Sequence, residues 1–318
     1  MPRTPVESNN TAVDTRIRHR SAPTPRAEAE NVPKCLPISP EEVLAGVRDL
    51  PAMPNVVIKI MRMTSKGEAT SPKELSGIIA QDPNFSARIL KMANSAYYGL
   101  PRSVSTLSDA VLMLGNHSIR NIAMLAATKD TLRQKVDGYE LRPGELWRHS
   151  LMCALASQLL AEQTCYHDKE VAFVGGLLHD VGKLVLGPYI RERLPSIRKR
   201  IDSEGCSFVE AERAVLGFDH AEIGGRIALH WNLPSVLVSA ISLHHNPVQK
   251  ECVSPLLALV YLGNLICFSI TDSNAIGSFS SEINKQCMEV LHLKEKHLST
   301  VILSLQEQME KVPLLSVE

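Results

Sequence analysis

The sequence predicts an all-α, multi-helical fold, and three observations carry that prediction. Aromatic residues make up only 4% of the 318 residues, whereas β-sandwiches and barrels rely on aromatic and β-branched strands. Apolar residues recur at helical spacing, and no stretch shows sustained apolar/polar alternation. Helix-start signals also recur along the chain. Because 44% of the residues are hydrophobic, a sizeable core can be buried.

Residues 1–36 differ in composition from the rest of the chain. They contain five prolines and scattered charges, and their large apolar residues never form a helical stripe. Such a segment buries too little apolar surface to fold, so we expect a disordered tail. Arg16, Arg18 and Arg20 could contact a phosphate-bearing partner, but a solvated tail is the favoured interpretation.

Capping signals mark several helix starts. Ser39-Pro-Glu-Glu42 and Ser71-Pro-Lys-Glu74 each place Ser at the N-cap, Pro at the first helical position and Glu at the third. Asp82-Pro83 repeats the cap-plus-proline start, and Ser207 with Glu210 gives a third capping box. These signals predict at least four helices, because each satisfies amides that the first helical turn leaves free.

Apolar periodicity extends the helical prediction along the chain. Leu107, Val111 and Leu114 precede Gly115, a typical residue for a helix C-terminus. Turn residues near 137–144 divide the chain into an N-terminal helical part (37–137), a second helical part (138–270) and C-terminal helices (271–318). Apolar residues at helical spacing predict further helices over 117–135, 144–163, 169–180, 189–203, 220–232, 235–244, 255–270, 281–293 and 294–311.

Charge and composition exclude several classes of partner. Thirty-four basic and thirty-four acidic residues leave no broad positive field for nucleic acid or an anionic membrane, and no helix-turn-helix stands out. The longest apolar stretch, 255–270, is too short to span a bilayer comfortably. The seven cysteines are scattered and never form a CxxC pair. We therefore expect a cytoplasmic protein with reduced thiols, binding neither nucleic acid nor membrane.

Histidines are concentrated in the second part of the chain, where nine of the eleven follow residue 138. A lone histidine is usually only a satisfied interior polar group, so the hypothesis of a site rests on the set. Imidazole and carboxylate ligands together suit iron, zinc or manganese, which activate water for attack on phosphorus. The pattern thus favours hydrolysis of phosphate esters. The candidate metal ligands are His149, His179, Asp180, His220, His244 and His245.

Other interpretations of the same region fare worse. Gly176 to Gly182-Lys183 has five intervening residues instead of the four of a phosphate loop, and Leu184 replaces its Ser/Thr. Neither a serine-hydrolase elbow nor a dinucleotide fingerprint occurs. Gly175 and Gly176 inside a helical pattern predict close helix packing. The basic run from Arg191 to Arg200 could attract an anion, although a solvated helix face is favoured.

Several motifs together make the chain resemble the HDOD family between about residues 50 and 268. The Ala-Asn-Ser and Tyr-Gly residues between Ala93 and Gly99 are the most specific, because HD enzymes at large lack them. The motifs are Leu50-Pro-Ala-Met-Pro54, Asp82-Pro83 with Ala87-Arg88, Ala93-Asn-Ser-Ala-Tyr-Tyr-Gly99, Ala110 to Gly115, and Leu177-Leu-His-Asp-Val-Gly-Lys183.

The resemblance implies an HD-domain-like helical bundle with an additional N-terminal helical subdomain, acting as a bacterial signalling output module related to HD and HD-GYP phosphohydrolases. By position, His149 resembles the first metal ligand of HD enzymes, His179 and Asp180 the central pair, and His220, His244 and His245 the extra histidines of the HD-GYP type. Two departures stand out. Asn264 occupies the place of a final metal-binding aspartate, and the Gly-Tyr-Pro signature is missing.

Two functions follow from this resemblance. The first is a regulatory module that acts through signalling proteins or a small phosphate-bearing ligand, with a divalent metal (iron, manganese or zinc) retained for structure or sensing. The alternative is a metal-dependent phosphohydrolase or cyclic-dinucleotide phosphodiesterase, in which Lys183 is a catalytic residue that stabilises the phosphoryl oxygens.

Overall fold

The computed structural model describes residues 38, 42, 43, 45, 52–65, 70–249, 253–271 and 285–311. This part of the chain is helical and has no strand, only an isolated bridge between Val136 and Leu141. The all-α prediction is therefore confirmed. The predicted tail over 1–36 and residues 39–41 of the first capping box lie outside the described residues.

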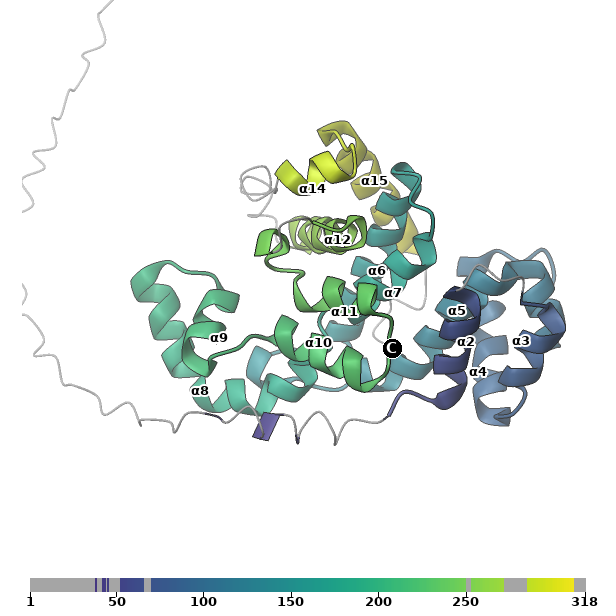
Figure 1. Cartoon of the computed structure of the whole chain (residues 1–318), viewed down its shortest axis with the longest axis horizontal. Coiled ribbons are helices and arrows are strands. Elements are labelled where there is room, and N and C mark those ends of the chain that lie inside the picture. The colour runs from purple at the N-terminus through teal and green to yellow at the C-terminus, as the bar shows by residue number, and fades with distance from the viewer. Residues whose placement is uncertain are drawn as a thin grey trace, which may run out of the picture. The chain divides into compact units, whose positions relative to one another are not determined.

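The first group of helices packs on α5 (Figure 1). Its helix α2 is an addition to the predicted helices: Val57, Ile60 and Met61 have helical spacing and are buried, but Pro54, which precedes the helix, offers no capping side chain. The Gly115 backbone (φ 78°, ψ 163°) breaks α5 where a helix end was predicted. The elements are α2 (Asn55–Ser65), α3 (Pro72–Ile79), α4 (Pro83–Ala93), η1 (Ala96–Tyr98) and α5 (Leu107–Leu132).

In the second group, α6, α7 and α12 contact one another and α11, α14 and α15 pack on them, whereas α8 contacts η2, α9 and α10 (Figure 1). The expected start of one helix at residue 189 was wrong, because Pro188 lies inside α8. The elements are η2 (Asp137–Tyr139), α6 (Glu145–Gln163), α7 (Lys169–Leu178), α8 (Gly182–Glu204), α9 (Phe208–Leu216), α10 (His220–His230), α11 (Ser235–Ser242), η3 (Pro247–Gln249), α12 (Pro255–Thr271), α14 (Lys285–Val290) and α15 (Glu295–Lys311).

Predicted caps begin three of these helices. The Ser71 side chain accepts from the Glu74 amide at 3.2 Å, and Asp82 Oδ1 accepts from the Phe85 amide at 3.0 Å. The complete reciprocal capping box forms between Ser207 and Glu210. Sequence signals thus fix where α3, α4 and α9 begin.

Length and composition alone would let the continuous segment 169–204, which contains α7 and α8, cross a membrane. However, 83% of its most apolar window is buried inside the protein. This burial is what a core helix of a folded domain requires.

Five cysteines lie in the described residues, and all five are free thiols.

Glycines set the closest helix contacts, as predicted for Gly175 and Gly176. A Cβ at Gly176 would lie 2.5 Å from the carbonyl oxygen of Cys153, so α7 touches the α6 backbone. A Cβ at Gly182 would overlap the carbonyl oxygen of His220, where α8 and α10 both begin. These contacts hold the second group of helices in a fixed arrangement.

Gly176→Ala is expected to lower the free energy of unfolding by about 1–3 kcal/mol, because backbone atoms of α6 must move to accept the new methyl group. Urea denaturation measures the change. Gly77→Ala is the matched control: nothing lies within 4 Å of its Cβ position in α3, so this variant should gain up to about 1 kcal/mol. Equal stability of both variants would contradict the close α6–α7 contact.

Candidate metal centre

The structure brings all six candidate ligands together, although they come from separate helices. His149 lies on α6, and His179 with Asp180 connects α7 to α8. His220 is the first residue of α10, and His244 with His245 follows α11 directly. Apart from the half-buried His149 and His245, these residues are at most 2% exposed. Their role as metal ligands stays a prediction.

Asp180 lies between two groups of imidazole nitrogens. On one side, its Oδ2 lies 3.5 Å from His149 Nε2 and 3.4 Å from His179 Nε2, and these two nitrogens are 3.2 Å apart. On the other side, Oδ1 lies 3.2 Å from His220 Nε2 and 3.7 Å from His244 Nε2. His245 Nε2 completes the second group, 2.9 Å from His220 Nε2. A single carboxylate thus joins two donor sets.

This donor arrangement fits divalent metal binding. Ligands about 2.1 Å from one ion lie about 3–4 Å from each other, which is the separation seen within each group. Asp180 Oδ1 and His244 Nε2 are buried and have no hydrogen-bond partner among the described residues. Buried polar atoms without a partner are costly, and a cation would satisfy both. Nitrogen and oxygen donors suit iron, zinc or manganese.

Outer hydrogen bonds turn the Nε2 atoms of three histidines toward the centre. His179 Nδ1 lies 2.7 Å from the Gly176 carbonyl oxygen, and His244 Nδ1 lies 2.7 Å from that of Ile241. Each such nitrogen donates to its carbonyl, which turns the Nε2 atom toward the centre. The Nδ1 of the third histidine, His220, is bonded to a carboxylate instead of a carbonyl.

The residues that sequence reasoning missed are Glu212 and Tyr139. Glu212 Oε2 lies 2.7 Å from His220 Nδ1, and Tyr139 donates to the other oxygen of the same carboxylate. Glu212 is fully buried in α9. Its position two residues after Glu210 of the capping box gives no signal in the sequence, because a glutamate there normally faces solvent.

Electrostatics favour neutral imidazoles at three positions. Burial lowers the pKa of His149 to about 3. Burial, followed by neighbouring histidines, also holds the pKa values of His244 and His245 well below the ordinary value. For His220 burial acts in the same direction, but the Glu212 and Asp180 carboxylates outweigh it and raise the pKa to about 9. Metal binding at His220 would therefore displace a proton.

Asp180 stays ionised although it is buried. Burial alone would raise its pKa, but the Lys183 ammonium and His179 bring it well below the ordinary value. Lys183 Nζ donates to Asp180 Oδ2 at 2.6 Å, and it lies 5.6 Å above the centre of the Tyr139 ring. Lys183 is thus at the centre, as the sequence predicted, and compensates its buried negative charge.

A cavity of about 320 Å³ opens beside the centre. His149, Asp180 and Lys183 line it, together with the exposed Arg148. Phe268, whose side chain is 44% exposed, contributes an aromatic wall with its ring centre 5.3 Å from that of His149. The cavity thus presents two cations, Arg148 and Lys183, and two carboxylates, Glu145 and Asp180, beside an apolar wall.

Asn264 also belongs to the centre. It is 4% exposed on α12, and its Oδ1 lies 3.1 Å from His149 Nε2. The residue therefore offers a neutral oxygen to the first donor group. The first donor group consequently has no negative charge other than that of Asp180.

The family model described as HDOD domain matches residues 50–247. The chain belongs to the HDOD family. This match includes Asp180 and all five candidate histidines, from His149 to His245. The family resemblance inferred from the sequence motifs is thereby confirmed.

Solved structures agree with this HDOD fold. An HDOD domain protein of unknown function from Geobacter sulfurreducens has a TM-score of 0.62 at 23% identity, covering 84% of this chain and 96% of that one. A candidate phosphohydrolase from Shewanella amazonensis has a TM-score of 0.65 at 25% identity, covering 86% and 98%. A candidate signal transduction protein from Marinobacter aquaeolei has a TM-score of 0.66 at 18% identity, covering 86% and 65%.

A curated relative is longer than this HDOD chain. An uncharacterized protein of Treponema pallidum is 24% identical over 220 residues, which cover 69% of this chain and 42% of that protein. The chain therefore spans less than half of this relative's length.

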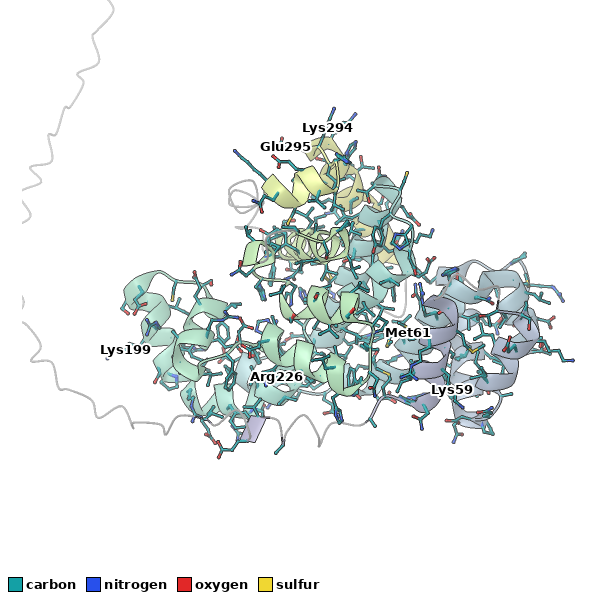
Figure 2. All side chains as sticks on the ribbon, in the orientation of Figure 1. Lys59, Met61, Lys199, Arg226, Lys294 and Glu295 are labelled. Atoms are coloured by element: carbon teal, nitrogen blue, oxygen red, sulfur yellow. The ribbon has the colours of Figure 1, made fainter. Side chains whose placement is uncertain are left out.

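Most of the basic run along α8 lies in solvent, as the favoured interpretation expected, but Arg193 is buried. Arg191 and Arg198 are largely exposed and pair with Asp137 and Glu140. Lys199 lies on the outer side of α8 (Figure 2). The run contributes no residue to the lining of the cavity beside the metal centre.

Glu212→Gln in this HDOD protein is expected to lower metal affinity about 10–100-fold, because the His220 imidazole loses the carboxylate that orients it and increases its basicity. Competition with a chromophoric chelator measures the affinity for manganese. Glu204→Gln is the control, since Glu204 only pairs with Arg200 on the surface of α8. Unchanged affinity in Glu212→Gln would show that the carboxylate does not support the centre.

Proposed function

We propose that this HDOD protein is a metal-dependent phosphohydrolase that cleaves a phosphate ester or diester. The observation that carries the proposal is the position of Asp180, whose two oxygens face two donor groups beside an accessible cavity. The 25% identical candidate phosphohydrolase from Shewanella amazonensis supports the same reaction class.

The two donor groups would hold one or two metal ions through five imidazoles and one carboxylate. His149 and His179 form one side, His220, His244 and His245 form the other, and Asp180 joins them. A divalent metal supplies Lewis acidity, which activates water and polarises the phosphoryl group. The proposed metal is iron, manganese or zinc, because these ions accept mixed nitrogen and oxygen donors.

The remaining residues of the cavity would bind and orient the substrate. Lys183 lines the cavity, and its Nζ can donate to a phosphoryl oxygen as well as to Asp180. Arg148 lies on α6 next to His149 and provides a second cationic group. The apolar wall around Phe268 would contact the leaving group and exclude water from it.

The test is hydrolysis by protein loaded separately with iron, manganese or zinc. The substrates are bis(p-nitrophenyl) phosphate, nucleotides and cyclic dinucleotides. We expect turnover of at least one substrate, dependent on the metal and absent in His179→Ala. Lack of turnover with all three metals, in protein shown by elemental analysis to contain them, would overturn the proposal.

A second candidate function is a signalling module that acts through partner proteins and keeps the metal for structure or sensing. Asn264 favours it, because a neutral oxygen replaces the carboxylate expected of an active HD enzyme. In that case, a folded His179→Ala variant should retain regulation of its partner. Loss of both hydrolysis and regulation in this variant, with unchanged thermal stability, would instead support the phosphohydrolase.

A further inference from the structure

The turn that contains η2 holds one tyrosine, Tyr139, against the helices of the metal centre. Val136 and Leu141 close this turn with two backbone hydrogen bonds of 3.2 and 3.3 Å. A Cβ at Gly138 would overlap the carbonyl oxygen of Gly187, so the turn touches the backbone of α8 directly. Tyr139 follows this glycine, and its side chain therefore starts from a fixed point beside α8.

The hydroxyl group of Tyr139 belongs to a chain of hydrogen bonds that ends at a candidate metal ligand. It donates to Glu212 Oε1, and Glu212 Oε2 lies 2.7 Å from His220 Nδ1. Because Glu212 is fully buried, water cannot take the place of the hydroxyl as a donor. Without this donor the carboxylate loses one of its two fixed contacts and can rotate away from the imidazole. The hydroxyl thus orients His220 through Glu212.

The ring of the same tyrosine contacts the cation of the centre. Lys183 Nζ lies 5.6 Å from the ring centre, within the distance at which the face of an aromatic ring attracts an ammonium group. This nitrogen also donates to Asp180 Oδ2 at 2.6 Å, and Lys183 lines the cavity beside the centre. The ring therefore gives Lys183 a second attachment, which acts together with Asp180 to fix the position of the ammonium group.

Two further rings restrict the orientation of Tyr139. Its ring centre lies 5.6 Å from that of Phe208, with the planes at 45°, and 5.9 Å from that of His220, with the planes at 83°. Aromatic pairs at such separations and tilts are favourable. Tyr139 thus contacts residues of α8, α9 and α10, the three helices that supply Lys183, Glu212 and His220.

We propose that Tyr139 is a positioning residue with two separate roles at the metal centre. Its hydroxyl orients His220 through Glu212 for metal binding, and its ring holds Lys183 in place for the phosphoryl group. The proposal rests on the proposed function, which assigns these two tasks to His220 and Lys183. The two roles use different atoms of one side chain. Tyr139→Phe therefore removes only the first role, whereas Tyr139→Leu removes both.

The first test is the NMR signal of the His220 Nδ1–H group in metal-free protein labelled with 15N-histidine. Glu212→Gln replaces the acceptor and so identifies the signal. Tyr139→Phe should shift or broaden it, because the carboxylate is no longer held from its other side. The matched control is Tyr189→Phe on α8, which removes a hydroxyl that donates to the Glu42 carbonyl at 3.2 Å and should leave the signal unchanged.

The affinity for manganese, measured by chelator competition, tests the same role. Tyr139→Phe should lower it about three- to tenfold, less than Glu212→Gln, because the hydroxyl acts on His220 only through that carboxylate. Tyr189→Phe should bind manganese as the wild type does. An unchanged His220 signal together with unchanged manganese affinity in Tyr139→Phe would overturn the first role.

The role of the ring is tested by calorimetric titration of manganese-saturated protein with methylphosphonate, an anion that cannot be hydrolysed as an ester. Tyr139→Leu should weaken its binding at least about threefold, whereas Tyr139→Phe, which keeps the ring beside Lys183, should bind it as the wild type does. Thermal melts establish that both variants are folded, and Tyr139→Phe still tests the proposal if Tyr139→Leu unfolds. Equal affinity in the two folded variants would overturn the second role. A wild type that binds no manganese would instead overturn the proposed function, and the signal of the metal-free protein would still decide the role of the hydroxyl.

Discussion

Asp180→Asn is expected to lower metal affinity by more than about 100-fold, at both donor groups together. The two Asp180 oxygens contact different donor groups, and Asp180 is the one candidate ligand that belongs to both. Asparagine keeps the size of the side chain but removes its charge and one of its two acceptor atoms. The loss should exceed that caused by the outer carboxylate of Glu212, because Asp180 would bind the ion directly.

Elemental analysis and chelator competition measure this result for the wild type, Asp180→Asn and a control. His167→Ala is the control, because His167 is exposed and belongs to neither donor group. Thermal melts identify any general loss of folding, since Lys183 loses its charged partner in the variant. Retention of the wild-type metal content by folded Asp180→Asn would exclude a centre built on this carboxylate.

Arg120→Ala is expected to lower the free energy of unfolding by about 3–5 kcal/mol. The Arg120 side chain is fully buried on α5, and it donates through both terminal nitrogens to the two carboxylate oxygens of Asp168. Removing one member of a buried ion pair leaves the other charge without compensation. Asp168 also caps α7, whose C-terminal end leads to His179, so the loss should loosen this helix as well.

Urea denaturation measures the effect of Arg120→Ala against an exposed ion pair that joins α4 to α5. Arg88 pairs with Asp130 of α5, but their side chains are 46% and 71% exposed. Arg88→Ala should therefore change the stability by less than about 1 kcal/mol. A similar small change in Arg120→Ala would show that the buried pair contributes little to the fold.

The sequence predicted the helices with clear end signals and the residues of the centre. Ser71, Asp82 and Ser207 cap helices as expected, because an N-cap depends on only a few neighbouring residues. His149 was found among the clustered histidines, and Asn264 through the family resemblance. The prediction failed for α2, which lacks a cap, and for the start of α8, where a proline continues the helix.

What could not be predicted depends on long-range packing. Glu212 differs from the exposed Glu210 only in the direction of its side chain on α9, and that direction is fixed by contact with α10. Likewise, Tyr97 and Gln308 are 211 positions apart, so only the folded chain brings them to one cavity. Spacing patterns within one helix contain no information on such pairs.

The contact between Gly182 and the His220 carbonyl has a mechanical consequence. Because the main chains of α8 and α10 meet there without an intervening side chain, no rotamer change can alter the distance between their first turns. Asp180 and His220 adjoin this contact, so α8 and α10 should move together as one rigid body. A conformational change that moves one of these helices must therefore move the other. The distance between Asp180 and His220 would then be preserved while access to the cavity beside them changes.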